Sequence, residues 1–197
     1  MKSQLRLLAK NNRAKINTIN SQNCLTENHI NFCLDKILFN KRDIKYVSLY
    51  YPIHNEISPF GFIKYFNLNN FKLTLPVVRA QSRSLLFKKW DLKDKLKRGK
   101  LGNLEPFYNA SDFLPQLIIV PMLMFDKNLN RLGYGGGYYD KSINELKKHF
   151  TREKKDFVTI GLAYSLQETK SIPHEAHDEQ LDFIITEKKL LSKINES

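Results

Sequence analysis

Cysteine is scarce in this chain of 197 residues, in which Cys24 and Cys33 are the only two. They share one stretch with helical spacing and form no C-x-x-C motif, which excludes a disulfide framework and a cysteine-based zinc site. Long apolar runs are also missing, so no segment has the length that crossing a bilayer requires. Polar Asn11, Asn12 and Arg13 stand where a secretory signal needs apolar residues. We therefore expect reduced cysteines that pack in the interior, a cytoplasmic protein and no membrane partner.

Acidic residues are the second shortage, because 20 Asp and Glu oppose 32 Lys and Arg and leave a formal net charge of +12. Such an excess fits nucleic-acid binding, anionic substrates or a lysine-rich surface. The densest basic stretch runs from Lys88 to Lys100, but Asp91 and Asp94 interrupt it and no RNA- or DNA-binding motif accompanies it. We interpret it as a solvated face and expect no nucleic-acid partner, although the positive field would steer anionic substrates inward.

Glycine is sparse except in one place: four of the eight glycines lie between positions 133 and 137. Glycine clusters occur where the backbone needs positive φ or approaches a ligand more closely than a Cβ allows. The apolar run 117–120 predicts a buried strand that Pro121 ends, and the spacing after Gly137 predicts a helix. Free amides at a helix N-terminus bind anions, so this glycine loop predicts a phosphate site.

Charged residues flank the glycine loop. Arg131 offers a planar fork for a phosphate or carboxylate, and Asp140 with Asp126 offers oxygen ligands for a hard cation. The run matches neither the Walker A pattern nor G-x-G-x-x-G. The alternative is a flexible turn in which Tyr138 and Tyr139 are ordinary core aromatics. We favour a site for a nucleotide and magnesium.

Helix and strand patterns alternate along the chain. Helical patterns cover residues 5–19, 25–38, 57–66 and 138–150, and strand patterns cover 43–51, 71–78, 84–87, 117–120, 157–164 and 181–186. We detect no linker or internal repeat, so residues 1–197 are expected to form one domain. The alternation predicts an α/β sheet with helices on both faces and ligands beyond the carboxyl ends of its strands.

One long motif is more specific than these patterns. Residues Leu117–Lys141, LIIVPMLMFDKNLNRLGYGGGYYDK, resemble the signature of the 5-formyltetrahydrofolate cyclo-ligase family, also called methenyltetrahydrofolate synthetases. Similar landmarks follow the family's order along nearly the whole chain: Lys2–Leu7, Tyr50–Ile57, Leu75–Arg79, Leu86–Trp90, Glu105–Pro106, Ile160–Ser165 and Pro173–Phe183. The resemblance implies a three-layer α/β/α, Rossmann-like sandwich with a partly mixed sheet.

The resemblance also implies an activity. With ATP and Mg²⁺, 5-formyltetrahydrofolate, with or without a polyglutamate tail, would become 5,10-methenyltetrahydrofolate, releasing ADP and phosphate. The formyl oxygen would attack the γ-phosphate, and N10 would close the ring as phosphate leaves. Such phosphoryl transfer depends on positioning and charge neutralisation, so it needs no protein nucleophile. We identify no nucleophile elbow or Cys–His pairing in the sequence, and we expect a monomer.

The family's functional residues fall on matching positions of this chain. The ATP site would comprise Lys2, Arg6, Arg131, Leu132, Gly133, Tyr134, Gly135, Gly136, Gly137, Tyr138 and Tyr139. The substrate site would comprise Tyr51, Glu56, Tyr134, Gly135, Gly136, Gly137 and Tyr138. Asp140 and Asp178 would hold magnesium, and the catalytic groups would be Arg131, Tyr134 and Asp140.

Several of these residues have an alternative role. Lys2 and Arg6, one helical turn apart, can simply keep a polar helix soluble. Glu56 can accept paired N–H groups of a reduced pterin, but it can also cap a helix that begins near residue 57. Tyr51 can pack on the flat ring, whereas Trp90 fits the folate pocket and the core equally well.

Asp178 can instead be a turn residue, and nearby His174 and His177 suggest a transition-metal site but lack a third ligand. The chain departs from the family at Gln116, where Asp is common, and at Gly136, which is Lys in some members. Loss of that lysine affects the rate and ATP affinity more than the reaction type.

Two other functions compete with this one. The first is a non-catalytic basic nucleotide- or RNA-binding protein that uses the same glycine loop, and the second is a family member whose formyl substrate differs. Glu56 distinguishes the folate enzyme from the RNA-binding protein, because a pterin pocket needs a carboxylate beside Tyr51 and an RNA site does not. RNA affinity would also weaken steeply with salt, whereas folate turnover need not.

Overall fold

A seven-stranded sheet forms the centre of the computed structural model, which describes residues 2–19, 25–41, 43–79 and 82–193. The strand order is β11-β10-β9-β6-β1-β2-β3. The bounds are β1 (Tyr46–Ser48), β2 (Lys72–Val78), β3 (Leu85–Lys89), β6 (Leu117–Pro121), β9 (Val158–Leu162), β10 (Phe183–Ile185) and β11 (Leu190–Ser192). β6 is a continuous apolar run and every residue of β9 is buried, as is typical of strands covered on both faces.

The sheet is partly mixed, as the family resemblance implies. Five adjacent strands are parallel to one another: β10, β9, β6, β1 and β2. The two edge strands are antiparallel to them, because β11 pairs with β10 and β3 pairs with β2. Ile119 of β6 lies opposite Ile160 of β9, and Ile118 lies opposite Ser48 of β1. Since parallel strands end at the same edge, the loops that follow them meet there.

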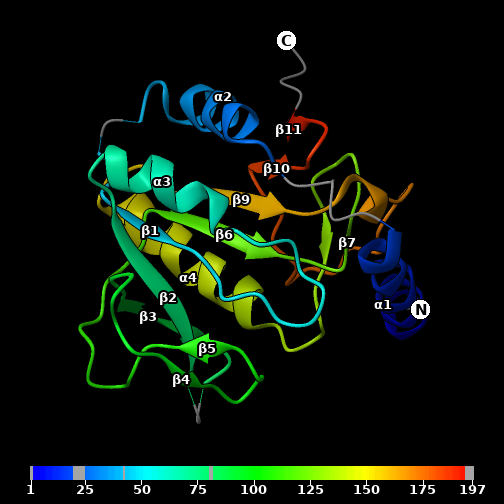
Figure 1. The fold of residues 1–197 in the computed structure, drawn as a ribbon, viewed down its shortest axis with the longest axis horizontal. Helices are drawn as coiled ribbons and strands as arrows, with labels where there is room; N and C mark the ends of the chain where they lie inside the picture. The colour runs from blue at the N-terminus through cyan, green and yellow to red at the C-terminus, as the bar shows by residue number, and fades with distance from the viewer. Residues whose placement is uncertain (1, 20–24, 42, 80–81, 194–197) are drawn as a thin grey trace.

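Two apolar cores lie on opposite faces of this sheet. α2 (Glu27–Leu38) and α3 (Gly61–Leu68) cover one face, where Leu34 and Phe62 are fully buried. α4 (Tyr138–Arg152) covers the other through Ile143 and Leu146. Figure 1 shows the three layers, with α4 behind the sheet. Each such side chain contributes about 1.5–3 kcal/mol by leaving water. The predicted three-layer α/β/α fold is confirmed.

α1 (Lys2–Ile19) contributes none of its side chains described, those of residues 2–14, to either core. It lies beside β7 (Met124–Phe125), beyond the arrowheads of β6 and β9 (Figure 1). β7 and β8 (Arg131–Leu132) form a hairpin, against which Ala9 of α1 is buried. α1 therefore covers the carboxyl edge of the sheet rather than one of its faces.

The predicted helix 57–66 begins later than expected, at Gly61. Ile57 is buried, and its carbonyl accepts a hydrogen bond from the Tyr50 hydroxyl. The chain reaches Gly61 through a turn in which Phe62 N–H donates to the Pro59 carbonyl, at 3.0 Å. Apolar residues of this packed turn therefore imitate the start of a helix.

Short strands escape the sequence patterns. They are β4 (Lys97–Arg98), β5 (Leu104–Glu105), the β7–β8 hairpin and β11, and a short helical turn also occurs at Ser165–Gln167. Two-residue strands are too short to show an alternation of apolar and polar residues. The glycine loop thus follows the β7–β8 hairpin, not the end of β6 directly.

The structure tests three expectations about single side chains. Trp90 lies in the core, 6.2 Å from the Phe60 ring centroid, so its core alternative is correct. Cys33 is buried with a free thiol, whereas Cys24 lies outside the described residues. Lys88 is 4% exposed and bonds Asp112 at 2.8 Å, so a fully solvated basic stretch was wrong at this residue.

Over the ranges described, no helix combines the length and apolar character needed to traverse a bilayer.

Candidate functional site

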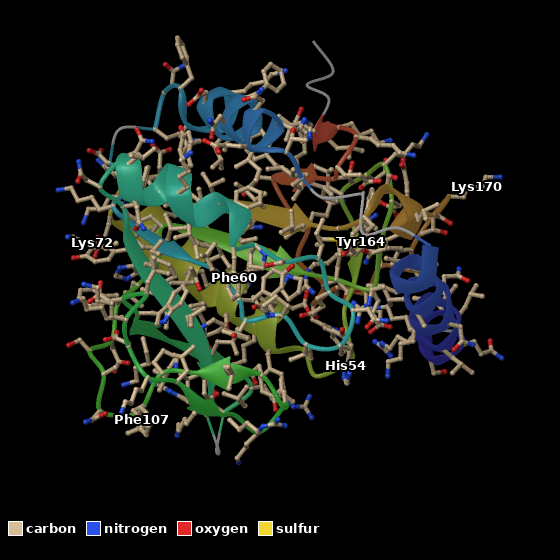
Figure 2. All side chains as sticks on the ribbon, in the orientation of Figure 1. His54, Phe60, Lys72, Phe107, Tyr164 and Lys170 are labelled. Atoms are coloured by element: carbon tan, nitrogen blue, oxygen red, sulfur yellow. The ribbon has the colours of Figure 1, made fainter. Side chains whose placement is uncertain are left out.

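A cavity of about 380 Å³ opens at the carboxyl edge of the sheet. The loop after β1, the glycine loop, the start of α1 and the loop before β10 all line it. In Figure 2, His54 of the loop after β1 lies near this edge, while Lys72, at the start of β2, lies at the opposite end. Its lining includes Lys2, Arg6, Tyr51, Glu56, Arg131, Leu132, Gly133, Tyr134, Gly135, Gly136, Gly137, Tyr138, Tyr139, Asp140 and Asp178. Every residue that the family resemblance assigns to the site therefore lies around one cavity.

The glycine loop needs glycine at two positions. Gly135 and Gly137 have φ of 101° and 67°, which L side chains rarely adopt. Gly137 is the N-cap of α4, and no side chain caps this helix end. Its first amides and its dipole thus face the cavity, an arrangement that binds anions. The alternative of a mere flexible turn does not account for this placement.

Arg131 and Asp140 form an ion pair at the base of the loop. Arg131 Nη2 donates to Asp140 Oδ1 at 2.8 Å, and the arginine side chain is 4% exposed. Glu179 N–H also donates to Asp140 Oδ1, at 3.2 Å. Arg131 Nε is buried and has no hydrogen-bond partner among the described residues. An unpaired buried donor is costly, so this position suits a ligand that supplies an acceptor.

The N-terminus of α1 reaches the same cavity. Lys2 Nζ donates to Asp178 Oδ2 at 2.6 Å and lies 3.1 Å from Glu175. Burial works to lower the pKa of Lys2, but the hydrogen bonds to Asp178 and Glu175 raise it overall. Arg6 Nε donates to the Gly133 carbonyl at 3.0 Å. Both cations therefore face the cavity, and the alternative of two solvated helix residues was wrong.

Gly135 and Arg6 make a close approach. A Cβ at Gly135 would lie 3.1 Å from the Arg6 guanidinium carbon. A larger residue would therefore press against the Arg6 side chain, in addition to the strain of positive φ. This glycine lets the loop and α1 meet.

Arg13 is a buried residue of the site that the sequence did not reveal. It is 3% exposed, donates to the Tyr134 hydroxyl, and its Nη1 lies 3.4 Å from the Met122 carbonyl. Its guanidinium carbon lies 5.5 Å from the Tyr134 ring centroid. A cation on a polar helix is normally expected to face solvent. The spacing could have identified Arg13, because Lys2, Arg6, Ala9 and Arg13 fall on one face of the helix.

Glu56 lies in the loop after β1 and accepts a hydrogen bond from Ile53 N–H at 2.9 Å. Burial raises its pKa, while Ile53 N–H, the Tyr134 hydroxyl and Arg13 oppose the shift. Burial and the nearby Glu56 likewise raise the pKa of Tyr134 to about 12. The carboxylate does not cap α3, which begins at Gly61, so the capping alternative was wrong.

Tyr51 presents its ring to the cavity and packs edge-on against Phe60, with ring centroids 5.1 Å apart. An aromatic ring held in this way can support a flat ligand ring. Glu56 and Tyr51 thus offer a polar and an apolar contact on the side of the cavity formed by the loop after β1.

Asp140 and Asp178 both line the cavity, each with one oxygen engaged by a cation. In the described chain, Asp140 Oδ2 and Asp178 Oδ1 accept no hydrogen bond, and the latter lies 3.9 Å from His177 Nε2. Oxygen atoms of two carboxylates suit Mg²⁺, which completes its coordination with phosphate and water. The donor set therefore fits magnesium.

Asp126 has a different role from the one predicted. It is 1% exposed and is absent from the cavity lining. Its oxygens accept hydrogen bonds from the N–H groups of Asn128, Asn130 and Ile172 and from the Asn130 side chain, at 2.9–3.1 Å. It organises the β7–β8 turn, so the prediction of Asp126 as a cation ligand was wrong.

The structure does not support a transition-metal site at His174 and His177. His177 is exposed at the rim, 3.5 Å from Glu175, and His174 does not line the cavity. Among the described residues, no group of three His, Cys, Asp or Glu side chains is arranged to hold a metal ion.

The two family departures lie in different places. Gln116 is remote from the cavity and bridges two backbone groups, donating to the Asp43 carbonyl at 2.6 Å and accepting from Lys45 N–H at 2.9 Å. Gly136 is in the loop itself, where a Cβ would lie 2.7 Å from the Tyr138 ring. A side chain at residue 136 would therefore move Tyr138.

Fold and cavity together define an α/β protein in which a glycine loop at a helix N-terminus and a half-buried carboxylate line one cavity. Comparison with known proteins identifies the family. The sequence model of the 5-formyltetrahydrofolate cyclo-ligase family matches residues 2–187, and the chain belongs to that family. It is accordingly an enzyme of the ligase class.

Relatives of this kind come from distant organisms. A 5-formyltetrahydrofolate cyclo-ligase of Haemophilus influenzae is 32% identical over 146 residues, 72% of this chain and 75% of that protein. One from Mycoplasma pneumoniae is 28% identical and covers 94% of this chain and 98% of that protein. The solved 5,10-methenyltetrahydrofolate synthetase of Aquifex aeolicus has a TM-score of 0.67 at 26% identity, over 100% of this chain and 95% of that one.

Proposed function

We propose that this protein acts as a single domain that uses ATP and Mg²⁺ to convert 5-formyltetrahydrofolate to 5,10-methenyltetrahydrofolate, releasing ADP and phosphate. One observation carries the proposal: a single cavity brings the glycine loop and its cations together with Glu56 and Tyr51. A triphosphate and a pterin can therefore lie side by side. Positioning of this kind supplies much of the rate of a phosphoryl transfer.

The triphosphate would lie against the glycine loop and the first turn of α4. Backbone amides there meet phosphate oxygens, and the buried Arg131 Nε supplies a donor that has no partner in the described protein. Lys2 and Arg6 approach from α1 and add two positive charges. Charge that develops on the transferring phosphoryl group is thereby neutralised.

Asp140 and Asp178 would hold magnesium, each through the oxygen that accepts no hydrogen bond. The ion, when bound, neutralises charge between the phosphates. Arg131 and Lys2 fix the two carboxylates through their other oxygens.

The pterin would lie over Tyr51 with its N–H donors directed at Glu56. An ionised carboxylate accepts two such donors, and a protonated one does not. Tyr134 approaches from the glycine loop and contributes its hydroxyl on the same side. The folate would thus be held through its ring while its formyl group faces the triphosphate.

The reaction proceeds through the substrate's own groups. The formyl oxygen forms a bond to the γ-phosphorus as the bond to ADP breaks, which turns a poor leaving group into a phosphate ester. N10 then attacks the formyl carbon, phosphate departs with its oxygen, and a proton leaves N10. The protein binds, orients and balances charge, so no side chain acts as a nucleophile.

The test is an assay for the methenyl product. Wild-type protein with ATP, Mg²⁺ and 5-formyltetrahydrofolate should show the methenyl absorbance, and Asp140→Asn should lower kcat by about 10²–10³-fold. Asp156→Asn, a change in a partly exposed ion pair with Lys41, is the matched control and should leave kcat unchanged. No product from folded wild-type protein would refute the proposal.

A non-catalytic RNA-binding protein has less support. Glu56, Asp140, Glu175 and Asp178 all line the cavity, and these carboxylates would repel a nucleic-acid backbone. RNA affinity that falls steeply between 50 and 200 mM salt, with no folate turnover, would favour it.

A further inference from the structure

Arg13 is a buried cation that lies near the cavity without lining it. Burying a guanidinium is costly unless its donors are satisfied and its charge is balanced. Its donors reach the Met122 carbonyl and the Tyr134 hydroxyl. Met122 also accepts from the Gln167 amide at 2.8 Å, so the carbonyl is itself held in place. Arg13 is thus anchored at one end and directed at the glycine loop at the other.

Tyr134 also lies close to Glu56, because both line the cavity and each affects the pKa of the other. A phenol has one proton and can also accept. Since Arg13 can only donate, the Tyr134 oxygen accepts from it, and the Tyr134 proton is left for an acceptor such as the Glu56 carboxylate. Ile53 N–H donates to Glu56 Oε2 at 2.9 Å. Guanidinium, phenol and carboxylate therefore form a series that leads from α1 to the loop after β1.

We propose that Arg13 is a positioning residue for the folate substrate, an inference that rests on the proposed function: its guanidinium fixes the Tyr134 hydroxyl, and that hydroxyl fixes the carboxylate of Glu56 that receives the pterin. Arg13 itself touches neither substrate. Its effect reaches the pterin only through Tyr134 and through its charge.

The surroundings of Glu56 make the charge of Arg13 effective. The groups that face Glu56 are Tyr134 of the glycine loop, Tyr139 of α4, Tyr50 of the segment after β1, and Arg13 of α1. The tyrosines are neutral at physiological pH, so Arg13 is the cation of this set. Burial raises the pKa of Glu56, and Arg13 acts against that shift. Without Arg13 the carboxylate would therefore protonate at a higher pH.

The first experiment compares Arg13→Met with wild type in steady-state kinetics. Losing a hydrogen bond from a charged group should raise KM for 5-formyltetrahydrofolate about 10- to 100-fold. Since Glu56 meets the pterin N–H groups and not the formyl group, kcat should change by less than about threefold. Arg152→Met is the matched control, because Arg152 is exposed at the end of α4.

A double mutant separates action through Tyr134 from independent action. If Arg13 acts through the phenol, Arg13→Met should add little to Tyr134→Phe, and the combined KM should stay within about threefold of the single Tyr134→Phe value. Multiplying effects would overturn the proposal.

The pH at which Glu56 titrates is a second test, because a purely structural role of Arg13 would not change it. The acid limb of kcat/KM should shift to higher pH in Arg13→Met, remain close to wild type in Arg13→Lys, and disappear in Glu56→Gln. The Glu56 carboxyl signal in ¹³C NMR, assigned by its loss in Glu56→Gln, should shift in the same direction without any substrate. An unchanged titration in folded Arg13→Met would refute the proposal.

The NMR result also separates this inference from the proposed function. A shifted Glu56 titration in a protein that makes no methenyl product would refute the reaction and leave the Arg13–Tyr134–Glu56 series standing. If Arg13→Met does not fold, Arg13→Lys and Tyr134→Phe decide. Lysine keeps the charge but cannot reach both acceptors, so it should raise KM while leaving the acid limb in place. An unchanged KM in both variants would overturn the proposal.

Discussion

α1 and α2 are the first two helices of the chain, and they are attached to the protein in opposite ways. α2 packs on the sheet through Ile30, Cys33, Leu34 and Ile37 and carries its charges on the outside. Over residues 2–14, α1 packs through Ala9 and Leu5 and is held through hydrogen bonds and ion pairs at the cavity. α2 contributes to the stability of the fold, whereas α1 contributes its inner face to the site.

This difference has a physical consequence. Apolar burial stabilises α2 whether or not a ligand is present. The cations of α1, by contrast, are held by carboxylates and a carbonyl at the cavity and would gain further partners when an anion binds. We therefore expect stability to depend mainly on α2 and catalysis mainly on α1, and four experiments probe that division.

The largest effect is expected from Leu34→Ala in α2. Leu34 is fully buried, so its truncation should cost about 2–5 kcal/mol in the free energy of unfolding. Urea unfolding measures this, and kcat per folded molecule should stay at the wild-type value. A loss of kcat in fully folded protein would break the division between the two helices.

The converse change is Arg6→Met in α1. Arg6 donates to the Gly133 carbonyl and faces the proposed triphosphate site, so kcat/KM for ATP should fall about 10- to 100-fold. The melting temperature should change little, because Arg6 belongs to no apolar core cluster. Lys36→Met, an exposed lysine of α2, is the control and should alter neither quantity.

Glu56→Gln tests the carboxylate that faces α1. Its folded-state pKa is raised, so the folded protein binds more protons than the unfolded chain between the ordinary and the raised value. Stability from this group therefore falls as pH rises through that window and stays lost above it. Glutamine does not ionise, so the variant should melt at a higher temperature than wild type at pH 7 while binding folate poorly. Equal melting temperatures from pH 3 to pH 8 would contradict this.

The smallest effect is expected from salt. Raising NaCl should weaken the Lys2–Asp178 pair, which is partly exposed, by less than about 1 kcal/mol. Amide hydrogen exchange in the first turns of α1 should accelerate, whereas exchange in α2 should not. Equal acceleration in both helices would mean that α1 is not held by charge.

Sequence patterns were sufficient where a single physical rule dominates. Apolar runs located β6 and β9, and the Gly137 N-cap located the start of α4. Patterns failed where tertiary packing determines the local structure. Ile57 is an example, because an apolar residue buried in a turn resembles the start of a helix in the sequence. Two-residue strands such as β4 leave no pattern to detect.

The site divides in the same way. Its glycines and flanking charges show in the sequence because they are unusual in composition and spacing. Arg13 and Lys88 do not, since a cation reveals its burial only once its partners, far away in the chain, are known. Asp126 illustrates the opposite error, because a carboxylate near a glycine loop resembles a ligand until its hydrogen bonds are seen.

That same Asp126 sets how far the glycine loop can adapt. Its four hydrogen bonds tie the β7–β8 turn to Ile172, and the other end of the loop is clamped by the first turn of α4. Any closing movement around the proposed nucleotide is therefore expected within residues 133–137. Only this short stretch would have to become ordered on binding, which limits the loss of chain entropy.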